Sequence, residues 1–445
     1  MKKKLFKFKD PDQYIKIGQK CFYVGTLLLS TTNFFAGFPY LISLLISLTN
    51  KTNPFNKDKW NLSLLICTII LILSSINISI IQNDNQTYEV LKYISWNPSS
   101  IWVSLFNWIP YFLAFSGFQI YLKTECQRIR VTKCLILGII PVIISILLQY
   151  WFQIYGPFKY LNGLVVFYLK PIQELGGYAG LFSNPNYAGL WLSASLPFCF
   201  LIPEIFKVNN KNKKIQFGVA YSIIISTIYC ILCTNSRNSL IGIMITTALM
   251  ISTKVLLISL LILGFIYFLL LEIATLPFLG SLGIKEILPS TIFSKLFQTN
   301  YLNKFQFSRI DIWQNALDLI KERPLFGWGA ATFPILYLIK GGIEDAQHTH
   351  SLPLEIAQTH GLPVSIILTL FVSLLLFKSS KIIFKNNGYS NSKINKAWIT
   401  SLLIIVISHI SDVTYYDGRV SLLIWILITG LKCILDEDKI KNKII

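Results

Sequence analysis

The sequence predicts an all-α protein that crosses a membrane about twelve times. Of its 445 residues, 53% are hydrophobic and only 14% are charged, whereas a soluble protein carries about 25% charged residues. Long stretches contain no Asp, Glu, Lys or Arg at all. A chain of this composition cannot cover a globular surface with charge, which excludes a disordered protein, a disulfide-stapled secreted module and an ordinary cytosolic enzyme.

The net charge of the chain is strongly positive. Lys and Arg number 40 and Asp and Glu number 21, which gives a formal net charge of +19. Such an excess is also typical of proteins that bind nucleic acid, but those proteins are not this apolar. We therefore expect membrane lipids around the chain and no nucleic-acid partner.

The charge-free stretches predict the individual helices, because a helix needs about 20 apolar residues to cross the hydrocarbon core. The first stretch, 21–50, is too long for one crossing, and Gly37 and Pro39 at its middle predict a tight helical hairpin. The remaining stretches predict one helix each: 60–83, 101–122, 134–158, 175–203, 215–236, 238–253, 255–271, 356–377, 397–411 and 420–431.

The distribution of Lys and Arg predicts the orientation, because these residues favour the cytoplasmic side of a membrane. A cytoplasmic N-terminus and alternating helices place most of them inside, so both termini are expected in the cytoplasm. Three regions follow: an N-terminal bundle of about nine transmembrane helices at 1–271, a large outer loop containing short helices at 272–351, and C-terminal transmembrane helices with a cytoplasmic tail at 352–445.

The cysteines do not suggest a disulfide framework. All eight lie in predicted helices or inner segments, and none falls in the large outer loop. Cys230 and Cys233 have the spacing of a redox or metal motif, but they lie within a predicted transmembrane helix. Packing is therefore favoured for this pair over redox or metal chemistry.

The large outer loop contains most of the polar residues that could bind a ligand or take part in catalysis. Residues 308–322 have one apolar helical face and end just before Pro324, which predicts an amphipathic helix followed by a turn at 324–329. Three of the four histidines then lie close together in the sequence: His348, His350 and His360.

Three interpretations of these histidines are open. They could hold zinc, but no cysteine is near and His360 is expected inside the next transmembrane helix. They could be ordinary surface or packed residues. The favoured interpretation is a catalytic or substrate-contacting histidine, and we expect neither a metal nor a cofactor.

Two arginines lie where an anion could bind. Arg237 interrupts two apolar stretches within 234–239, between Asn and Ser residues and at the start of a predicted helix. It is either an interfacial anchor or part of a phosphate site formed with the helix N-terminus. Arg309, preceded by Ser308, opens the amphipathic loop helix in the same way, although an exposed helix-surface arginine is about as plausible.

A third polar cluster covers 176–187 and contains Asn184, Asn186 and Tyr187. Its Gly, Asn and Pro residues permit an irregular backbone that lines a cavity, or they form a plain connecting loop. Two Asp-x-Asp patterns, beginning at Asp10 and Asp436, fall in the inner termini and are interpreted as solvated. An outer site would therefore neutralise phosphate with arginine instead of a metal ion.

These clusters, in this order, resemble the O-antigen ligase/polymerase superfamily over residues 176–363. The matching parts are the loop ending at Asn186, the turn around Arg237, the segment after Ser308 and the turn at 324–329. The best match is a His-(Asn/Ser/Gln)-x9-Gly-x-x-Gly pattern beginning at His350, from which the chain departs only at Val364.

The resemblance implies a metal-independent glycosyltransferase of the multi-spanning, GT-C-like type in a bacterial inner membrane. Such enzymes transfer a glycan from an undecaprenyl-diphosphate carrier to a lipid- or protein-linked acceptor on the periplasmic side. It implies that Arg237 and Arg309 bind the diphosphate and that His350 orients or deprotonates the acceptor hydroxyl. Asn184, Asn186, Tyr187, Ser308 and His348 are the expected cavity-lining residues.

Other functions remain alternatives at this point. A repeat-unit polymerase and a protein O-glycosylase belong to the same superfamily and share its motifs. Similar proteins are also described as inorganic-carbon transporters, which suggests a bicarbonate site at Arg237. A transporter, however, is expected to have polar or broken helices near the bilayer midplane and two related halves.

Overall fold

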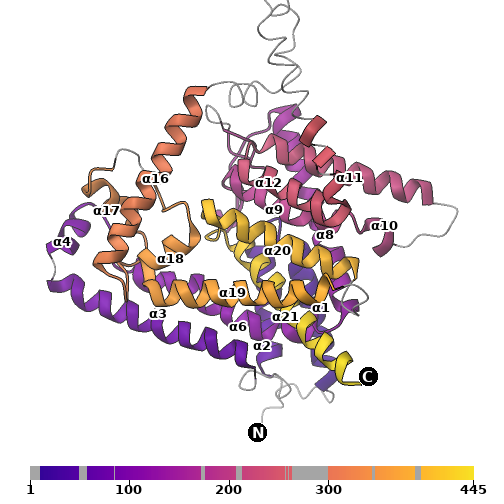
Figure 1. Ribbon diagram of the computed structural model, residues 1–445, viewed down its shortest axis with the longest axis horizontal. Helices are drawn as coiled ribbons and strands as arrows, with labels where there is room; N and C mark the ends of the chain where they lie inside the picture. Colours follow the sequence, from indigo (N-terminus) through magenta and orange to yellow (C-terminus); the bar gives the residue numbers. More distant parts are fainter. Residues whose placement is uncertain are drawn as a thin grey trace, which may run out of the picture.

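The computed structural model describes residues 11–49, 58–84, 86–171, 176–206, 213–255, 257–258, 260–262, 299–342, 346–385 and 392–444. In this part the chain is almost entirely helical (Figure 1). The N-terminal half contains α1 (Pro11–Leu28), α2 (Asn33–Leu48), α3 (Lys59–Asp84), α4 (Gln86–Tyr93), α5 (Ser100–Val103), η1 (Ser104–Asn107), α6 (Ile109–Gly117), α7 (Gln119–Leu122), α8 (Glu125–Phe152), α9 (Pro185–Cys199), α10 (Ile202–Ile205), α11 (Lys213–Cys233) and α12 (Arg237–Thr246).

The C-terminal part contains α16 (Thr299–Glu322), α17 (Phe333–Ile339), α18 (Leu352–His360), α19 (Leu362–Ile383), α20 (Lys393–Ser411) and α21 (Gly418–Ile444). A small antiparallel hairpin, β1 (Phe158–Tyr160) and β2 (Val165–Phe167), follows α8, with Phe158 opposite Phe167. This hairpin is an addition to the all-α fold that the sequence predicts.

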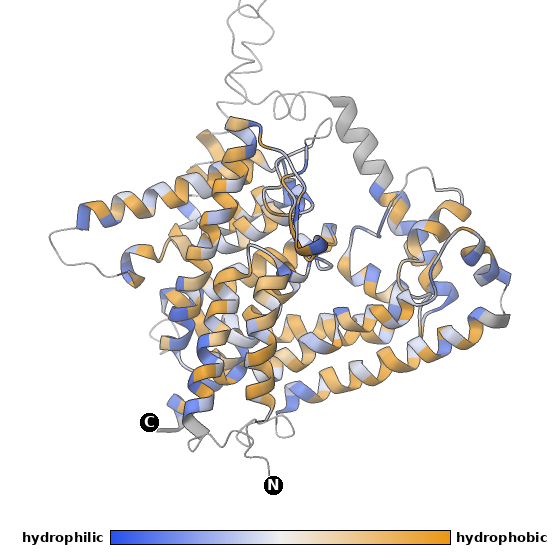
Figure 2. Cartoon of the chain, turned by 180° about the vertical axis from the view of Figure 1, so that it is seen from behind, coloured by the Kyte–Doolittle hydropathy of each residue, from blue (hydrophilic) through white to orange (hydrophobic). Residues whose placement is uncertain are grey.

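Within the described residues, six helices are long and apolar enough to cross a membrane: α3, α8, α11, α19, α20 and α21. They form the long, mostly hydrophobic helices of Figure 2. The predicted number of about twelve crossings stays a prediction. Residues 263–298, which include most of the predicted helix 255–271 and the start of the large loop, lie outside the described residues, and the three predicted regions therefore stay a prediction too.

Two of the predicted transmembrane helices are interrupted. The stretch 101–122 forms the short pieces α5, η1, α6 and α7, and the stretch 175–203 contains α9, which has only 15 residues. The predicted helix 356–377 is likewise two helices, because the chain turns at Gly361 between α18 and α19. The interruptions lie where Gly and Pro occur, in accordance with their effect on helices.

The first hairpin turns at a different place from the predicted one. The turn lies between Leu28 and Asn33, where the side chain of Thr32 caps α2 by accepting a hydrogen bond from the Phe35 backbone. Gly37 and Pro39, the predicted turn residues, lie inside α2. The prediction was wrong because glycine and proline can lie inside a membrane helix, whereas the Thr32 cap satisfies a backbone N–H group at the start of α2 that would otherwise be unpaired.

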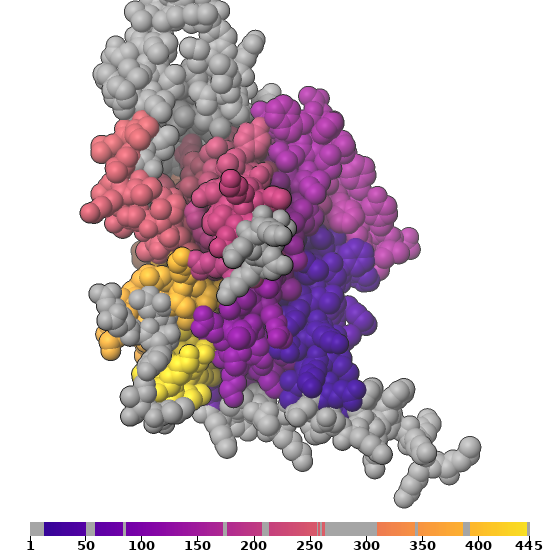
Figure 3. Space-filling view, turned by 90° about the vertical axis from the view of Figure 1, so that its right-hand side faces the viewer, coloured from indigo at the N-terminus to yellow at the C-terminus, as the bar shows by residue number. Residues whose placement is uncertain are grey.

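Partly buried ion pairs join the helices at the end of the bundle where α21 ends. Figures 1 and 3 show the indigo start and the yellow end of the described chain at this end. Lys432 of α21 binds Asp58 and Asp436, each at 2.6 Å, and the buried Arg128 of α8 binds Glu437 at 2.6 Å. Asp436 was predicted to be solvated; its side chain is 41% exposed and also belongs to this network. One helical turn separates it from Lys432, so the two side chains face each other.

The side chains pack into two hydrophobic cores. The large one fills the bundle, and a smaller one lies under α16 and α17, beside α4 and the end of α3 (Figure 1). In the small core Arg323 stacks over the rings of Tyr88 and Trp328, at 4.8 Å and 4.2 Å from their centroids. The amphipathic helix predicted at 308–322 is the second part of α16, and its buried face packs in the small core. Arg309 was predicted to open this helix, which is wrong, because α16 already begins at Thr299.

Candidate functional site

His350 lies in a tight loop that leads into α18. Its backbone is left-handed, with φ 54°, a conformation that an ordinary residue adopts only when its surroundings impose it. The buried carboxylate of Glu355 accepts a hydrogen bond from the Thr349 backbone N–H at 3.0 Å, and the Thr349 hydroxyl donates to the Ser351 carbonyl at 2.9 Å. These bonds hold the loop, and with it the imidazole of His350, in one place.

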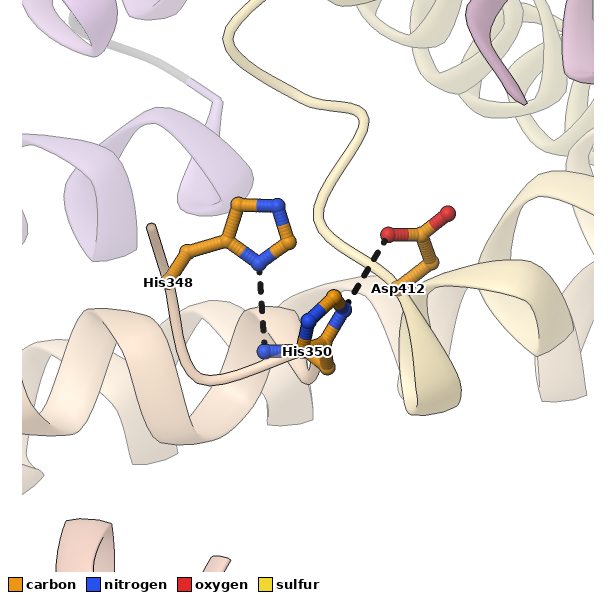
Figure 4. Close-up of side chains that lie close together, drawn as sticks. All are labelled: His348, His350 and Asp412. Atoms are coloured by element: carbon orange, nitrogen blue, oxygen red, sulfur yellow. Dashed lines mark hydrogen bonds and ion pairs between the residues drawn. The ribbon is translucent and has the colours of Figure 1, made fainter. Parts of the chain in front are cut away.

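His348, His350 and Asp412 form a cluster (Figure 4). The two imidazole rings are 4.4 Å apart between centroids, and the backbone N–H of His350 donates to Nδ1 of His348 at 3.2 Å. Asp412 comes from the loop after α20, and its Oδ1 is 3.8 Å from Nδ1 of His350. This separation suits an ion pair but is too long for a hydrogen bond.

The cluster contains one neutral imidazole and one carboxylate. Burial and then the neighbouring His350 lower the pKa of His348 to about 4, so His348 is neutral at neutral pH. Burial alone would raise the pKa of Asp412. The adjacent His350, the imidazole of His348 and a backbone N–H donated by Val413 at 2.8 Å outweigh burial and hold that pKa below its usual value.

The ionised Asp412 determines which nitrogen of His350 is basic. A carboxylate beside Nδ1 favours the tautomer that carries its proton there, which leaves Nε2 as the acceptor. Within the described residues Nδ1 of His350 has no hydrogen-bond partner, so a small approach toward Asp412 would complete this pair. The arrangement is suited to general base chemistry.

The two candidate arginines lie close to this cluster. Burial and the nearby charge of Arg237 lower the pKa of Arg309, and the carboxylate of Asp412 opposes that shift. Arg309 in turn contributes to the lowered pKa of His348. Two guanidinium groups that repel each other next to a histidine pair favour an anion between them.

Arg237 is positioned by the helix contacts around it. It is the first residue of α12, and Ser236 precedes it in an extended conformation. The hydroxyl of Ser411, the residue before Asp412, donates to the side chain of Asn238 at 3.1 Å. The N-terminus of α12, where the exposed Arg237 lies, is therefore next to the end of α20, which Asp412 follows.

The predicted loop 176–187 packs against the turn that precedes Arg237. The backbone N–H of Tyr178 donates to the Cys233 carbonyl at 3.0 Å, and a Cβ at Gly177 would lie 1.8 Å from the carbonyl oxygen of Thr234. Glycine is therefore required at 177, because the two backbones touch there. Two motifs that are far apart in the sequence thus form one surface.

The predicted cavity-lining residues have different surroundings. Asn184 caps α9, and its side chain accepts a hydrogen bond from the Asn186 backbone at 2.8 Å. Tyr187 lies within electrostatic range of Asp417 and Asp412, next to the cluster. Ser308 belongs to α16, but its side chain lies outside the described residues.

The turn at 324–329 supports the helix that carries His350. The backbone N–H groups of Trp328 and Gly329 donate to carbonyls of α18, at Gln358 (2.8 Å) and Thr359 (3.0 Å). At Gly361, φ is 95° and a Cβ would lie 2.1 Å from a backbone oxygen of the turn. The glycine of the motif that begins at His350 is therefore a packing requirement, and Val364, where the chain departs from the motif, is fully buried.

The other two histidines do not belong to the cluster. His360 is buried at the end of α18 with its ring against that of Trp108, at 6.4 Å between centroids. His409 is buried in α20 and shares a hydrogen bond with the Thr414 hydroxyl at 2.9 Å. The cysteines of the predicted pair, Cys230 and Cys233, are free and buried.

Asp412 was missed by the sequence analysis, although a signal was present. It immediately follows the charge-free stretch 397–411, at the same end of the bundle as His350. The same loop contributes a buried ion pair, Asp417 with Arg419 at 2.7 Å. Arg419 also donates to the Leu181 carbonyl at 3.0 Å, which ties α21 to the loop 176–187.

A metal ion is one ligand that the cluster could hold. One ligand atom each from His348, His350 and Asp412 lies within 4.8 Å of the other two. However, Nδ1 of His348 already accepts a backbone hydrogen bond, and the guanidinium of Arg309 would repel a cation. These residues therefore suit an anionic substrate better than a metal, and the predicted absence of a metal stays a prediction.

The region that contains the two histidines of the cluster matches a known protein family. Residues 222–369 match the model of the O-antigen ligase family. This part of the chain is therefore similar to an O-antigen ligase domain. The match supports membership in that family, as the resemblance predicted, and no curated protein matches the chain.

The matched region includes Arg237, Arg309 and His350, whereas Asp412 and the loop 176–187 lie outside it. Together with the apolar helices, the family indicates a multi-pass membrane protein with an O-antigen ligase- or polymerase-like function. It also indicates a ligase- or glycosyltransferase-like enzyme, acting on a lipid-linked glycan and an acceptor.

Proposed function

We propose that the protein transfers a glycan from an undecaprenyl-diphosphate carrier to an acceptor hydroxyl on the periplasmic side of a bacterial inner membrane, without a metal ion. Both termini are cytoplasmic in this proposal. The observation that carries it is the proximity of two mutually repelling arginines to the His350–Asp412 pair. One side of such a site binds a polyanion, and the other side accepts a proton.

Arg237 and Arg309 bind the diphosphate in this mechanism. Arg237 is the first residue of α12, so the positive end of the helix dipole favours the same anion. As the bond between the sugar and the diphosphate breaks, negative charge grows on the leaving oxygen. The two guanidinium groups stabilise that charge, so the transition state is bound more tightly than the donor.

His350 takes the proton of the acceptor hydroxyl. Asp412 orients the imidazole through Nδ1 and stabilises the cation that forms, while Nε2 receives the proton. The acceptor oxygen then bonds to the anomeric carbon as the diphosphate leaves. His348 stays neutral and holds the His350 backbone, so its role is to position the base.

Ligation is favoured over repeat-unit polymerisation and protein O-glycosylation because of the motif at His350. The resemblance that begins at His350 is of the ligase type, whereas a repeat-unit polymerase and a protein O-glycosylase remain alternatives with the same chemistry. A bicarbonate transporter is a further alternative, but the candidate site residues lie beside the ends of α12 and α20, whereas a transporter is expected to place its site near the middle of the bilayer.

The test is glycan transfer by the purified protein in lipid vesicles. The donor is a short glycan on undecaprenyl diphosphate, and release of undecaprenyl diphosphate is measured with a membrane extract that supplies acceptors. We expect His350→Ala to abolish release and wild type to be insensitive to a chelator. Full release by His350→Ala at equal protein level would refute the catalytic role, and saturable bicarbonate flux abolished by Arg237→Ala would favour transport.

A further inference from the structure

Aromatic and aliphatic side chains protrude from the segment that follows α8. We call these exposed residues the hairpin patch: Trp151, Phe152, Ile154, Phe158, Tyr160, Leu161 and Leu164. The last four belong to the hairpin β1–β2 or to its turn, and the two leucines are 60% and 63% exposed. The described part of the chain leaves this surface uncovered.

The hairpin patch begins where α8 reaches a membrane surface. Arg128, near the start of α8, pairs with Glu437 of α21 at 2.6 Å, at the end of the bundle where α21 ends. From there α8, a candidate membrane span, has no charged residue between 134 and 152. At about 1.5 Å per residue, this part is about 28 Å long, close to the hydrocarbon core of about 30 Å. The end of α8 therefore lies at the opposite membrane surface, and the hairpin follows directly.

The residue types around the patch are those of a membrane–water interface, where Trp and Tyr rings are enriched and lysines direct their ammonium groups to the headgroups. Lys159 is the exposed middle residue of β1. Lys170 is exposed after β2, with its Nζ 5.8 Å from the ring centroid of Tyr168. Residues 151–171 contain no Asp or Glu. The two lysines therefore give the patch a positive charge that complements anionic lipid phosphates.

The turn of the hairpin carries leucines where a turn that faces water carries polar residues. Leu161, Asn162 and Gly163 are left-handed, with φ values of 50°, 55° and 88°. The Leu164 N–H closes the turn by donating to the Leu161 carbonyl at 3.1 Å. Asn and Gly adopt this conformation readily, whereas leucine adopts it only against a steric cost. Two exposed leucines at this tip indicate an apolar environment around it.

The backbone limits how deeply the hairpin enters the membrane. Among the described residues the sheet has two strands, paired from Phe158 and Phe167 to Tyr160 and Val165. The outer N–H and C=O groups of such a sheet need hydrogen-bond partners, and hydrocarbon offers none. The hairpin therefore fits the headgroup layer, where water reaches its edge while its side chains reach the upper part of the acyl chains.

Hydrogen bonds connect the hairpin to the candidate site. The N–H of Leu169, after β2, donates to the Gly180 carbonyl at 2.9 Å, and the Gly180 N–H donates to the side chain of Gln149 at 2.7 Å. Gly180 belongs to the loop 176–187, which packs against the turn that precedes Arg237. A hairpin held at one depth in the membrane thus holds this turn at a fixed depth as well.

We propose that the hairpin patch, with Lys159 and Lys170, binds the phospholipid headgroup layer on the side of the candidate site and anchors the site at that surface. The leucines of the turn and the aromatic rings enter the upper acyl region, and the two ammonium groups bind anionic lipid phosphates. This anchoring does not depend on which glycan or acceptor the site takes.

Depth-dependent fluorescence quenching tests the position of the hairpin. A dansyl-bearing amino acid replaces Leu164 in the full-length protein in phosphatidylcholine vesicles. The lipids carry bromine on either the upper or the lower part of their acyl chains. The same probe at Leu370, exposed near the middle of α19, is the membrane reference, and the probe at Lys321, exposed on α16, is the aqueous reference. Thermal melts show that each labelled protein is folded.

We expect upper-chain bromine to quench the probe at 164 at least about twofold more than lower-chain bromine, as for an interfacial group. The probe at 370 should show the reverse preference, and the probe at 321 should be quenched by neither lipid. Quenching at 164 as weak as at 321 would overturn the proposal. Emission at 164 that follows the protein-to-lipid ratio instead of the bromine position would show a second copy on the patch, which also overturns it.

Lipid selectivity tests the two lysines with the same probe at 164. Brominated phosphatidylglycerol, which is anionic, is compared with brominated phosphatidylcholine at the same low mole fraction. We expect phosphatidylglycerol to quench about fivefold more effectively, equivalent to about 1 kcal/mol for a lysine beside a membrane surface. Lys159→Gln with Lys170→Gln should remove this preference, whereas the matched control Lys321→Gln should keep it. A preference that survives in the double variant would overturn the binding of anionic lipid by these lysines.

Discussion

Replacement of Asp412 by asparagine tests the electrostatic part of the mechanism. Asparagine has nearly the same shape, so the loop after α20 keeps its packing, while the negative charge beside His350 disappears. The Val413 N–H can still donate to the amide oxygen. The imidazolium that forms when His350 accepts a proton would then lose its counter-charge.

The magnitude follows from the separation of the two groups. At 3.8 Å, two unit charges interact by about 1 kcal/mol in water and about 4 kcal/mol at an effective dielectric constant of 20. The His350 side chain is 30% exposed and that of Asp412 only 7%, so an intermediate value applies. We expect a loss of about 2 kcal/mol in transition-state stabilisation, which is about a 30-fold fall in kcat.

The assay is release of undecaprenyl diphosphate in vesicles, with kcat and KM for the donor measured separately. The donor KM should change less than kcat, because the diphosphate is held by the arginines. Asp318→Asn is the control, since it removes an exposed charge elsewhere on the surface. A kcat for Asp412→Asn within twofold of wild type, with unchanged thermal stability, would refute the role given to Asp412.

Three further predictions concern stability. The pKa of His348 is lowered from 6.5 to about 4 in the folded protein. Its contribution to stability is therefore complete above pH 6.5 and declines as the pH falls from 6.5 toward 4. In thermal melts, His348→Asn should flatten this pH dependence. Gly361→Ala should destabilise the protein by about 1–3 kcal/mol or more, because its backbone is left-handed and the space is occupied, whereas Gly218→Ala, in open space within α11, should not. Arg419→Met should lower the free energy of unfolding by about 3–5 kcal/mol, because it leaves Asp417 as a buried unpaired charge. A melting temperature equal to that of wild type for Gly361→Ala or Arg419→Met would contradict the expectation for that variant.

The sequence predicts the helical class well because transmembrane helices depend on composition alone. Six of the described helices are long and apolar enough to cross a membrane, and each overlaps a stretch that lacks charged residues. The breaks are harder to predict. The hairpin turn at Thr32 depends on one capping hydrogen bond, and the turn at Gly361 depends on the segment 324–329, which is distant in the sequence.

The candidate site shows the same limit. Arg237 is a candidate from the sequence because it interrupts two apolar stretches, and Arg309 because it begins the predicted amphipathic segment. His350 is a candidate because three histidines lie close together and because the best-matching motif of the resemblance begins there. Asp412 could not be paired with His350 in this way, since the two residues are separated by two long helices, α19 and α20. For the same reason the buried partners of Asp436 were missed, because the sequence does not say which helices are neighbours.

Binding of undecaprenyl diphosphate is the measurement that tests the central claim most directly, because it needs neither an acceptor nor catalysis. We expect wild type in chelator-treated vesicles to bind this product, and we expect Arg237→Gln with Arg309→Gln to weaken binding at least a hundredfold, about 2.7 kcal/mol. Arg130→Gln, near the start of α8 at the opposite end of the bundle, should bind like wild type. Equal binding by wild type and the double variant would contradict the account.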